Sequence, residues 1–395
     1  AVAYYDKGAG EGLSIGEYVG QELEYLVGST HKPVDEPVDV VLYGFGRIGR
    51  LMARILIAKT DGGDSLRLRG VVVRRGKAED DLLKRASLLR RDSVHGVFQG
   101  TIRVDEERQS FVANGNEIKV IYADSPEEID YTEYGINRCI VIDNTGVWRD
   151  EAGLSRHLQA EGVAKVILTA PGKGDIKNIV AGINDSDIAD DDTILSAASC
   201  TTNAIVPVLK AADDEYSISA GHVETVHAYT NDQNLIDNYH KAERRGRSAA
   251  LNMVLTETGA AKAVAKVLPQ LEGKLTGNAI RVPTPNVSMA ILNLTLNRST
   301  TRDELNDFMR ETALHSSMKK QIDYSNSPEV VSSDFVGSRA ACVFDAKATI
   351  VNGNQAVLYL WYDNEFGYSC QVYRVLEQMG GIRYQTYPAK GPYPL

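Results

Sequence analysis

The chain has 395 residues, of which 43% are hydrophobic and 24% are charged, and its formal net charge at pH 7 is -10. This length predicts two or three domains with full hydrophobic cores, and the acidic balance argues against nonspecific binding to nucleic acid. No apolar run approaches the ~18 residues that can span a bilayer, so we do not expect a membrane protein.

Cysteine usage indicates a reducing compartment. The four cysteines lack C-x-x-C spacing, which argues against a disulfide framework and against a zinc site. We therefore expect no bound metal and a cytoplasmic location. The chain starts without methionine, which leaves open an organelle that is reached with removal of a targeting segment.

An N-terminal extension and linker is predicted over residues 1–37. Val19, Leu23, Leu26 and Val27 have the spacing of one helix face, which could cover a surface patch or a subunit interface. Two prolines then separate this segment from the next. We expect an accessory packing arm rather than a catalytic module.

A strand, a glycine-rich turn, a helix and a second strand follow the extension. Residues 40–43 have the pattern of a buried strand, 44–49 read Gly-Phe-Gly-Arg-Ile-Gly, and 50–58 have the pattern of a helix. The second strand is expected at 68–73. This is G-x-G-x-x-G in the strand–turn–helix context that dinucleotide binding requires.

Each glycine of this turn has a physical role. Gly44 permits the tight turn, Gly46 lets a pyrophosphate approach the backbone, and Gly49 lets helix and strand pack closely. The alternative is a glycine-rich turn with a structural role only. The pattern predicts an α/β fold with a Rossmann-type doubly wound parallel sheet, which forms a dinucleotide-binding domain over residues 38–198.

The second strand ends in basic residues where NAD-binding folds carry an acid that grips the adenosine ribose. Arg74 and Arg75 occupy this place, followed by Gly76 and Lys77. Guanidinium groups bind a 2′-phosphate through charge-assisted bonds, whereas an acid would repel it. This favours NADP over NAD. The alternative is a solvated basic loop beside the acidic residues 79–81.

A single thiol stands at the start of an apolar segment. Cys200 lies in Ser-Cys-Thr-Thr-Asn at 199–203, and residues 204–209 have the pattern of a helix. A helix N-terminus supplies N–H donors and about half an elementary charge, which stabilise a thiolate. His227, in a strand expected to end near 230–232, could complete a thiolate–imidazolium pair. Taken alone, either residue would be assigned to an inert core.

Longer pleated strands follow the nucleophile. They are expected at 221–228, 278–282, 287–296 and 355–362, with helices at 249–268 and 302–314. This alternation predicts an α+β catalytic domain with a mixed sheet over residues 199–364.

Motifs occur in a fixed order along the chain: Gly44–Gly49, Asp92-Ser93-Val94-His95-Gly96, 199–203, 227–233, Thr258-Gly259-Ala260-Ala261-Lys262, 281–286 and 361–368. In order and sequence they resemble those of phosphorylating glyceraldehyde-3-phosphate dehydrogenases, from residue 38 to about 379. The resemblance implies that a last helix, about 365–380, returns to the cofactor domain. Residues 381–395 would form a C-terminal tail, extended or disordered.

The resemblance also implies a reaction. Cys200 would attack the aldehyde of D-glyceraldehyde 3-phosphate, and His227 would lower the thiol pKa, remove the hemithioacetal proton and stabilise the later oxyanion. Hydride would pass to NADP or NAD. Inorganic phosphate would then cleave the thioester and release 1,3-bisphosphoglycerate, in either direction of glycolysis or gluconeogenesis.

Binding residues follow by resemblance, position by position. The cofactor would contact Gly44, Gly46, Arg47, Ile48, Gly49, Arg74, Arg75, Thr145, Gly146, Thr169 and Asn364, the last of which fixes the carboxamide. The substrate phosphate would contact Thr230, Asp232 and Arg281. Inorganic phosphate would contact Ser199, Thr258, Gly259 and one arginine of 244–247, for which we favour Arg244, and Thr201 completes the phosphate-binding residues. The arginine run alone could equally be a surface charge cluster.

Two departures from the family pattern have consequences. Asn238-Tyr239 stands where NAD-specific members carry Leu-Pro in a segment that crosses from a neighbouring subunit, which removes apolar crowding near a 2′-phosphate. Ala204 stands where many members have a second cysteine, so an intramolecular resolving thiol is absent. The family is homotetrameric, and we expect the same here, with no membrane partner and no specific nucleic acid partner.

Two other functions remain open at this point. An erythrose-4-phosphate dehydrogenase of the same superfamily would turn over without phosphate. A non-catalytic RNA-binding or scaffolding relative would keep the fold but not the chemistry. The complete set Cys200, His227, Arg281 and Asn364 argues against the second alternative.

Overall fold

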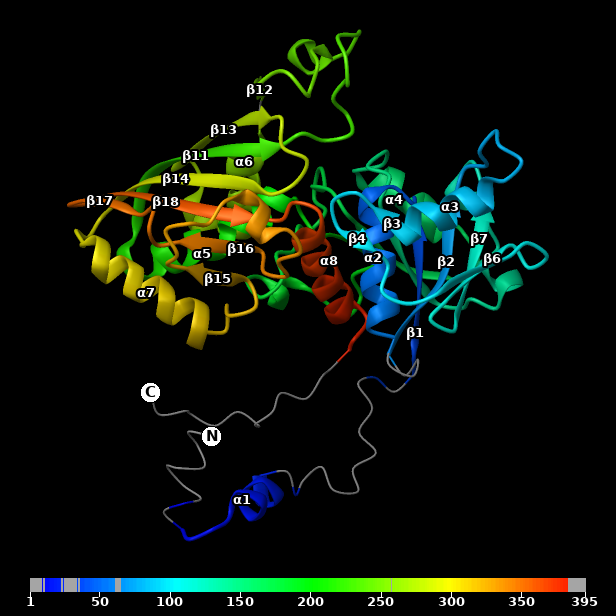
Figure 1. Ribbon diagram of the computed structural model, residues 1–395, viewed down its shortest axis with the longest axis horizontal. Coiled ribbons are helices and arrows are strands. Elements are labelled where there is room, and N and C mark those ends of the chain that lie inside the picture. Colours follow the sequence, from blue (N-terminus) through cyan, green and yellow to red (C-terminus); the bar gives the residue numbers. More distant parts are fainter. Residues whose placement is uncertain are drawn as a thin grey trace.

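The computed structural model describes residues 9, 11–22, 24, 34, 36–60, 65–256 and 258–382. The predicted helix face of the extension falls partly outside them, because Leu23, Leu26 and Val27 are not described, and neither is the tail after residue 382. Val19 lies on α1 (Ile15–Glu22), in which no residue is buried. Figure 1 shows α1 apart from both sheets, whereas Val34, nearer the end of the extension, packs against the core of the first sheet.

The first sheet is doubly wound, with the strand order β10-β9-β8-β1-β2-β7-β6-β5. The strands are β1 (Val38–Tyr43), β2 (Leu66–Val73), β5 (Ile102–Asp105), β6 (Ser110–Ala113), β7 (Asn116–Tyr122), β8 (Cys139–Asp143), β9 (Val163–Leu168) and β10 (Ile194–Ser196). Pairing is parallel from β10 to β7 and antiparallel from β7 to β5. Because the chain order reverses beside β1, the carboxyl ends of β1, β2 and β8 border the usual ligand crevice.

Helices cover this sheet and include the last helix of the chain. They are α2 (Arg47–Ala58), α3 (Asp81–Arg90), α4 (Glu151–Leu158) and α8 (Phe366–Met379). Val372 and Leu376 of α8 share one buried core with Met52 and Leu56 of α2. Figure 1 shows α8 between the two sheets, beside α2. The short strands β3 (Arg91–Asp92) and β4 (Gly96–Val97) form a hairpin nearby.

The second sheet is mixed, with the order β12-β13-β11-β14-β18-β16-β15, and β17 pairs with β18. Its strands are β11 (Ile218–Ala228), β12 (Val254–Thr256), β13 (Leu275–Val282), β14 (Ser288–Leu296), β15 (Ile322–Ser325), β16 (Cys342–Asp345), β17 (Ile350–Asn352) and β18 (Gln355–Tyr362). The helices α5 (Cys200–Tyr216), α6 (Ala260–Val267) and α7 (Arg302–His315) share a core with it. The predicted α/β class, with a doubly wound sheet and a mixed sheet, is confirmed.

Single turns of 3-10 helix connect these elements: η4 (Pro126–Glu128), η5 (Tyr131–Tyr134), η6 (Asp185–Asp187), η7 (Glu243–Gly246), η8 (Pro269–Leu271) and η9 (Ser332–Phe335).

The helix predicted over 249–268 is wrong in its first half. Residues Val254–Thr256 form β12, an edge strand that pairs antiparallel with β13, and α6 begins only at Ala260. Valine and threonine are stiff side chains that favour strands, and Gly259 at the N-cap marks the real start of the helix. The other predicted strands lie within observed ones, with two exceptions. Val287, with φ of +65°, precedes β14, and the strand expected to end near 230–232 ends at Ala228 of β11.

The turn between β1 and α2 uses its glycines as predicted. Gly44 has φ of +92°, which lies in the region that favours glycine. A side chain at Gly49 would clash with the carbonyl oxygen of Gly44, whereas a Cβ at Gly46 would have no neighbour within 4 Å. The helix therefore packs tightly on the turn at Gly49 and leaves open space at Gly46.

Gly49→Ala and Gly46→Ala should separate packing from ligand approach. We expect Gly49→Ala to lower the free energy of unfolding by about 1–3 kcal/mol, because the added methyl group overpacks the turn. Gly46→Ala should leave stability within about 0.5 kcal/mol of the parent, because its φ of -74° suits alanine. Urea unfolding of both ligand-free variants checks this, and equal losses would contradict the assignment of the packing contact to Gly49.

Candidate active site

The thiol of Cys200 stands at the first position of α5. Ser199 is the N-cap, and its hydroxyl accepts a hydrogen bond from the Thr202 N–H at 3.0 Å. The preceding Ala198 has φ of +54°, a conformation that costs energy for a residue with a side chain. Because Cys200 opens the helix, its N–H has no acceptor within the helix and points out of its N-terminus.

His227 faces this thiol from the end of β11. Its Nε2 lies 3.5 Å from Sγ of Cys200, and its Nδ1 lies 2.7 Å from the carbonyl oxygen of Ala228. A carbonyl only accepts, so this contact fits a neutral ring with its proton on Nδ1. Nε2 then presents its lone pair to the thiol, as a general base requires.

Arg281 supplies the nearest positive charge. It sits opposite His227 in the parallel register of β11 and β13, and its Nη1 donates to the carbonyl oxygen of Ala228 at 3.1 Å. The same nitrogen lies 2.7 Å from Nδ1 of His227, and because a guanidinium only donates, this contact fits the other tautomer, with the proton on Nε2. Nε of Arg281 is buried without a hydrogen-bond partner in the described chain, so this guanidinium still has a donor for an anion.

Burial disfavours the charged form of both reactive groups. It raises the pKa of the Cys200 thiol, although the charge of Arg281 acts in the opposite direction. Burial and then Arg281 lower the pKa of His227 to about 3. Both shifts act against the preformed thiolate–imidazolium pair that the sequence suggested. His227 fits the role of proton acceptor during attack better.

Tyr362 and Ser288 support the catalytic pair and were not predicted. The Tyr362 hydroxyl lies 2.9 Å from Oγ1 of Thr201 and 2.7 Å from Oγ1 of Thr225, so it joins α5 to β11. The Ser288 hydroxyl accepts from the Ala228 N–H at 3.1 Å and donates to Oδ1 of Asn364 at 2.8 Å. These residues lie in strands that the sequence did predict, but only strand pairing brings them to the site.

The arginine run is resolved differently from the prediction. Arg244 is exposed on η7, whereas Arg245 pairs with Asp232 at 2.7 Å and donates to Oγ1 of Thr256 at 3.0 Å. Thr230 also donates to the Asp232 carboxylate. The assignment of Arg244 to the site is therefore corrected to Arg245. Both residues have the same chemistry, and only the local turn decides which one points inward.

A cavity of about 380 Å³ lies at the carboxyl ends of β1, β2 and β8. It is lined by Tyr43, Gly44, Phe45, Gly46, Val72, Val73, Arg74, Arg85, Ala123, Thr145, Val147 and Trp148. A Cβ at Gly46 would meet no neighbouring atom, so the backbone there is open to a pyrophosphate, and the cavity fits a dinucleotide. Arg75 is not among the lining residues, and Arg85 was not predicted.

Hydrogen bonds to a buried carboxylate, that of Asp143, fix the loop after β8. Oδ1 of Asp143 accepts from the N–H and the hydroxyl of Thr145, both at 2.7 Å. Nε2 of His157 lies 3.0 Å from Oδ2 of the same carboxylate. The Thr169 hydroxyl donates to the Asp143 carbonyl at 3.0 Å, and Gly146 has φ of +63°. Asp143 thus fixes both predicted cofactor loops, although the sequence analysis did not single it out.

The side chain of Arg47 does not face the cofactor cavity. Its guanidinium pairs with Asp92 at 3.0 Å and with Glu365. The predicted cofactor contact of Arg47 is therefore limited to its backbone N–H, which together with that of Ile48 opens α2 toward an anion.

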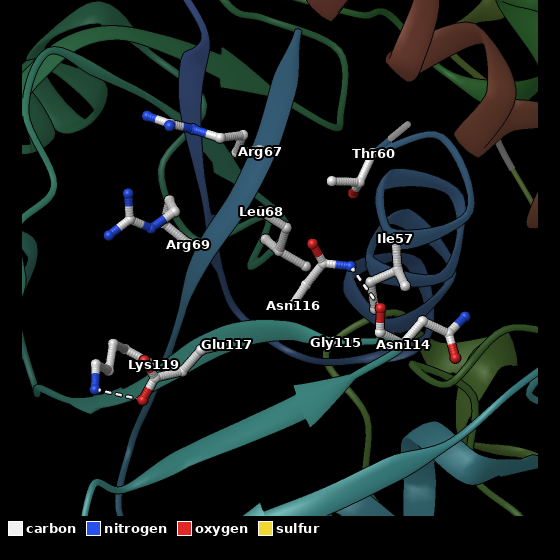
Figure 2. A pocket seen from close by; sticks show the side chains of 10 residues that line it. All are labelled: Ile57, Thr60, Arg67, Leu68, Arg69, Asn114, Gly115, Asn116, Glu117 and Lys119. Carbon is white, nitrogen blue, oxygen red and sulfur yellow. Dashed lines mark hydrogen bonds and ion pairs between the residues drawn. The ribbon is translucent and has the colours of Figure 1, made fainter. Parts of the chain in front are cut away.

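A larger cavity, about 620 Å³, lies at the amino ends of β2 and β7, opposite the ends that border the first cavity (Figure 2). Arg67 and Arg69 line it, but both pair with the buried Asp39, at 2.7 and 3.5 Å. Lys119 pairs with Glu117 at 2.8 Å. Each of these three cations thus has a carboxylate partner within the fold. None of the predicted site residues lines this cavity.

Two kinds of site are absent from the described residues. No cluster of three or more histidine, cysteine or acidic side chains could hold a metal ion, and no helix is long and apolar enough to cross a membrane.

Comparison with known proteins agrees with the geometry. Residues 38–151 match the family model described as glyceraldehyde 3-phosphate dehydrogenase, NAD binding domain, and residues 199–364 match the C-terminal domain of the same family. A glyceraldehyde-3-phosphate dehydrogenase-like protein of Pseudomonas aeruginosa strain UCBPP-PA14 is 65% identical over 382 residues, which cover 97% of this chain and 83% of that protein.

More distant relatives carry the same description. The glyceraldehyde-3-phosphate dehydrogenase of Zymomonas mobilis is 38% identical over 344 residues, 87% of this chain and 98% of that protein. Chloroplastic glyceraldehyde-3-phosphate dehydrogenase A of Zea mays is 40% identical over 347 residues, 87% of this chain and 83% of that protein. The chain belongs to the glyceraldehyde-3-phosphate dehydrogenase family, as its motifs predict, and is an NAD(P)-dependent dehydrogenase.

Proposed function

We propose that the chain catalyses the reversible, phosphorylating oxidation of D-glyceraldehyde 3-phosphate to 1,3-bisphosphoglycerate, with NADP preferred. The single observation that carries the proposal is the 3.5 Å contact between Sγ of Cys200 and Nε2 of His227 at the start of α5. It joins a nucleophile, a general base and helix N–H donors, which covalent aldehyde chemistry needs.

The first half of the reaction uses the neutral pair. Nε2 of His227 takes the thiol proton as Sγ of Cys200 bonds to the aldehyde carbon, and the Cys200 N–H stabilises the oxygen of the hemithioacetal. His227 gives this proton to the oxygen, which forms the hemithioacetal hydroxyl, and takes it back as the hydride leaves the carbon. A nicotinamide bound in the cleft supplies the hydride acceptor, and the carbon becomes a thioester.

The second half releases the product. An oxygen of inorganic phosphate attacks the thioester carbon, the bond to sulfur breaks, and Cys200 leaves as a thiolate that recovers its proton from His227. Arg281 and Arg245 supply positive charge for the two phosphates, and Thr230, Ser199 and Thr258 supply hydroxyl groups. Asp232 acts through Arg245, because a carboxylate repels phosphate.

The NADP preference is supported by charge. Arg74 lines the cavity at the end of β2, and the acid that would favour NAD is absent there. Tyr239 is 90% exposed in this chain, and Asn238 precedes it, so no apolar Leu-Pro pair crowds a 2′-phosphate at a subunit contact.

A homotetramer is part of the proposal and is supported by exposed apolar side chains. Four apolar side chains in the segment between β11 and β12 are each more than two-thirds exposed: Leu235, Ile236, Leu251 and Met253. Exposed apolar clusters of this kind indicate protein contacts. The number of subunits comes from the family resemblance alone.

A reducing compartment such as the cytoplasm also belongs to the proposal. It is supported by the four cysteines, none of which forms a disulfide, and it suits the central carbohydrate metabolism of the family.

Initial rates test the proposed reaction directly. With glyceraldehyde 3-phosphate we expect turnover that requires inorganic phosphate and that is at least about 10-fold more efficient with NADP than with NAD, because a charged hydrogen-bond pair typically contributes that much. Phosphate-independent turnover, with erythrose 4-phosphate as the better substrate, would replace the substrate assignment. Cys200→Ser should abolish the burst of reduced cofactor, and a burst that survives in this variant would contradict the covalent mechanism.

The pH dependence of Cys200 reactivity tests the neutral pair. We expect alkylation by iodoacetamide in the ligand-free protein to accelerate up to and beyond pH ~8.5, because the raised pKa keeps the thiol protonated below that value. Mass spectrometry of the labelled peptide measures this, with the buried Cys342 as an internal control. A rate already maximal below pH ~7 would demonstrate the preformed ion pair instead.

Arg245→Gln and Arg244→Gln form a matched pair for the corrected arginine. Arg245→Gln should lower kcat/KM by about 10-fold or more through the KM of a phosphate-bearing reactant, because Asp232 then lacks its partner. Arg244→Gln, on an exposed residue, should stay within about 2-fold. Steady-state kinetics with both phosphates varied checks this, and the opposite ranking would restore Arg244.

A further inference from the structure

Arg85 of α3 reaches back to the turn that follows β2. Its Nε pairs with Oδ2 of Asp81 at 2.7 Å, one helical turn earlier, and its Nη2 donates to the carbonyl oxygen of Arg74 at 2.7 Å. The Arg85 side chain is only 19% exposed. It lines the cofactor cavity together with Arg74, and its Nη1 forms no hydrogen bond with the described residues.

The same carboxylate ties in a third element. The Tyr122 hydroxyl, at the end of β7, donates to Oδ2 of Asp81 at 2.9 Å. The guanidinium of Arg75 lies over the Tyr122 ring, 4.0 Å from its centre, and Arg75 does not line the cavity. Of the three arginines around this turn, Arg74 and Arg85 face the cavity and Arg75 is held by the aromatic ring.

Charge and order make Arg85 suited to a phosphate. Three guanidinium groups surround the turn, and of the acidic residues there Asp81 pairs with Arg85 whereas Asp80 pairs with Lys84, outside the arginine group. Burial raises the pKa of Asp81, but hydrogen bonds from Arg85 and Tyr122 lower it below its ordinary value, so the carboxylate stays charged and keeps Arg85 in place. An arginine that is already ordered loses less conformational entropy when it binds a ligand.

We propose that Arg85, with Arg74, binds the 2′-phosphate of NADP, and that Asp81 and Tyr122 are positioning residues for Arg85. The proposal rests on the proposed NADP preference and changes which arginines produce it: the pair is Arg74 and Arg85 rather than Arg74 and Arg75. The competing explanation is that Arg85 only fastens α3 to the turn after β2.

Binding of two nucleotides that differ by one phosphate separates these explanations. The probes are adenosine 2′,5′-bisphosphate and adenosine 5′-monophosphate, titrated calorimetrically into the intact protein and into Arg85→Gln, Arg75→Gln and Arg90→Gln. Arg90 is the matched control, because it lies on the same helix and donates to a backbone carbonyl, that of Ile102, outside the cavity.

The expected result is a loss specific to the 2′-phosphate. Arg85→Gln should weaken the bisphosphate by about 10- to 100-fold and the monophosphate by less than about 3-fold, whereas Arg75→Gln and Arg90→Gln should change both by less than about 3-fold. Arg85→Lys should restore part of the loss, because it keeps the charge but not the fork.

Three other outcomes overturn the inference. Equal losses for both nucleotides in Arg85→Gln would show a structural role. A larger specific loss in Arg75→Gln would return the site to Arg74 and Arg75, with the NADP preference intact. If the parent binds both nucleotides equally well, the NADP preference itself fails, and the role of Arg85 fails with it.

Discussion

The ion pairs of Arg47 with Asp92 and Glu365 connect parts of the chain that are far apart in sequence. Arg47 opens α2 directly after the glycine turn, and Glu365 precedes α8, next to Asn364. His95 extends the link, since its Nε2 lies 3.3 Å from Oδ2 of the buried Asp363. The cofactor turn and the residue expected to orient the carboxamide are thereby fixed to the same group of charges.

The charged cluster of Arg47, Asp92, His95, Asp363 and Glu365 also gives a structural role to the motifs at 92–96 and 361–368. Burial lowers the pKa of His95, but the carboxylates of Asp363, Glu365 and Asp92 raise it above its ordinary value. The positive charge of Arg47, joined by that of His95 when the ring is protonated, offsets three carboxylates that would otherwise repel one another. The motifs at 92–96 and 361–368 therefore connect the first sheet's domain to the segment that follows β18.

At the site itself, position and electrostatics have different origins. The start of α5 and the register of β11 with β13 place Cys200, His227 and Arg281 together. Burial then disfavours charge on either partner of the catalytic pair. A thiol that loses its proton only when it attacks the aldehyde resists oxidation between turnovers, and Ala204 provides no second thiol one helical turn away.

The selectivity between NADP and NAD likewise depends on residues that the sequence shows and on side-chain directions that only the tertiary structure decides. Arginines at 74 and 75 are visible in the sequence, but their directions are not. Tyr122 and Asp81, contributed by β7 and α3, hold Arg75 away from the cavity and bring Arg85 to it. A charge count of the segment after β2 alone selects Arg74 and Arg75, whereas the arginines that line the cavity are Arg74 and Arg85.

The sequence by itself predicted the features that depend on interactions between residues close together in the chain. The glycine turn, the strands on either side and the thiol at a helix start depend on neighbours a few residues away, and the motifs of the family contain them. Tertiary structure alone decided the choice of Arg245 over Arg244, the pairing of Arg47 with Asp92 and Glu365, and β12 in place of half a predicted helix. These depend on partners 13 to more than 300 residues apart or on strand pairing, because a side chain's direction and charge state are set by what the fold brings against it.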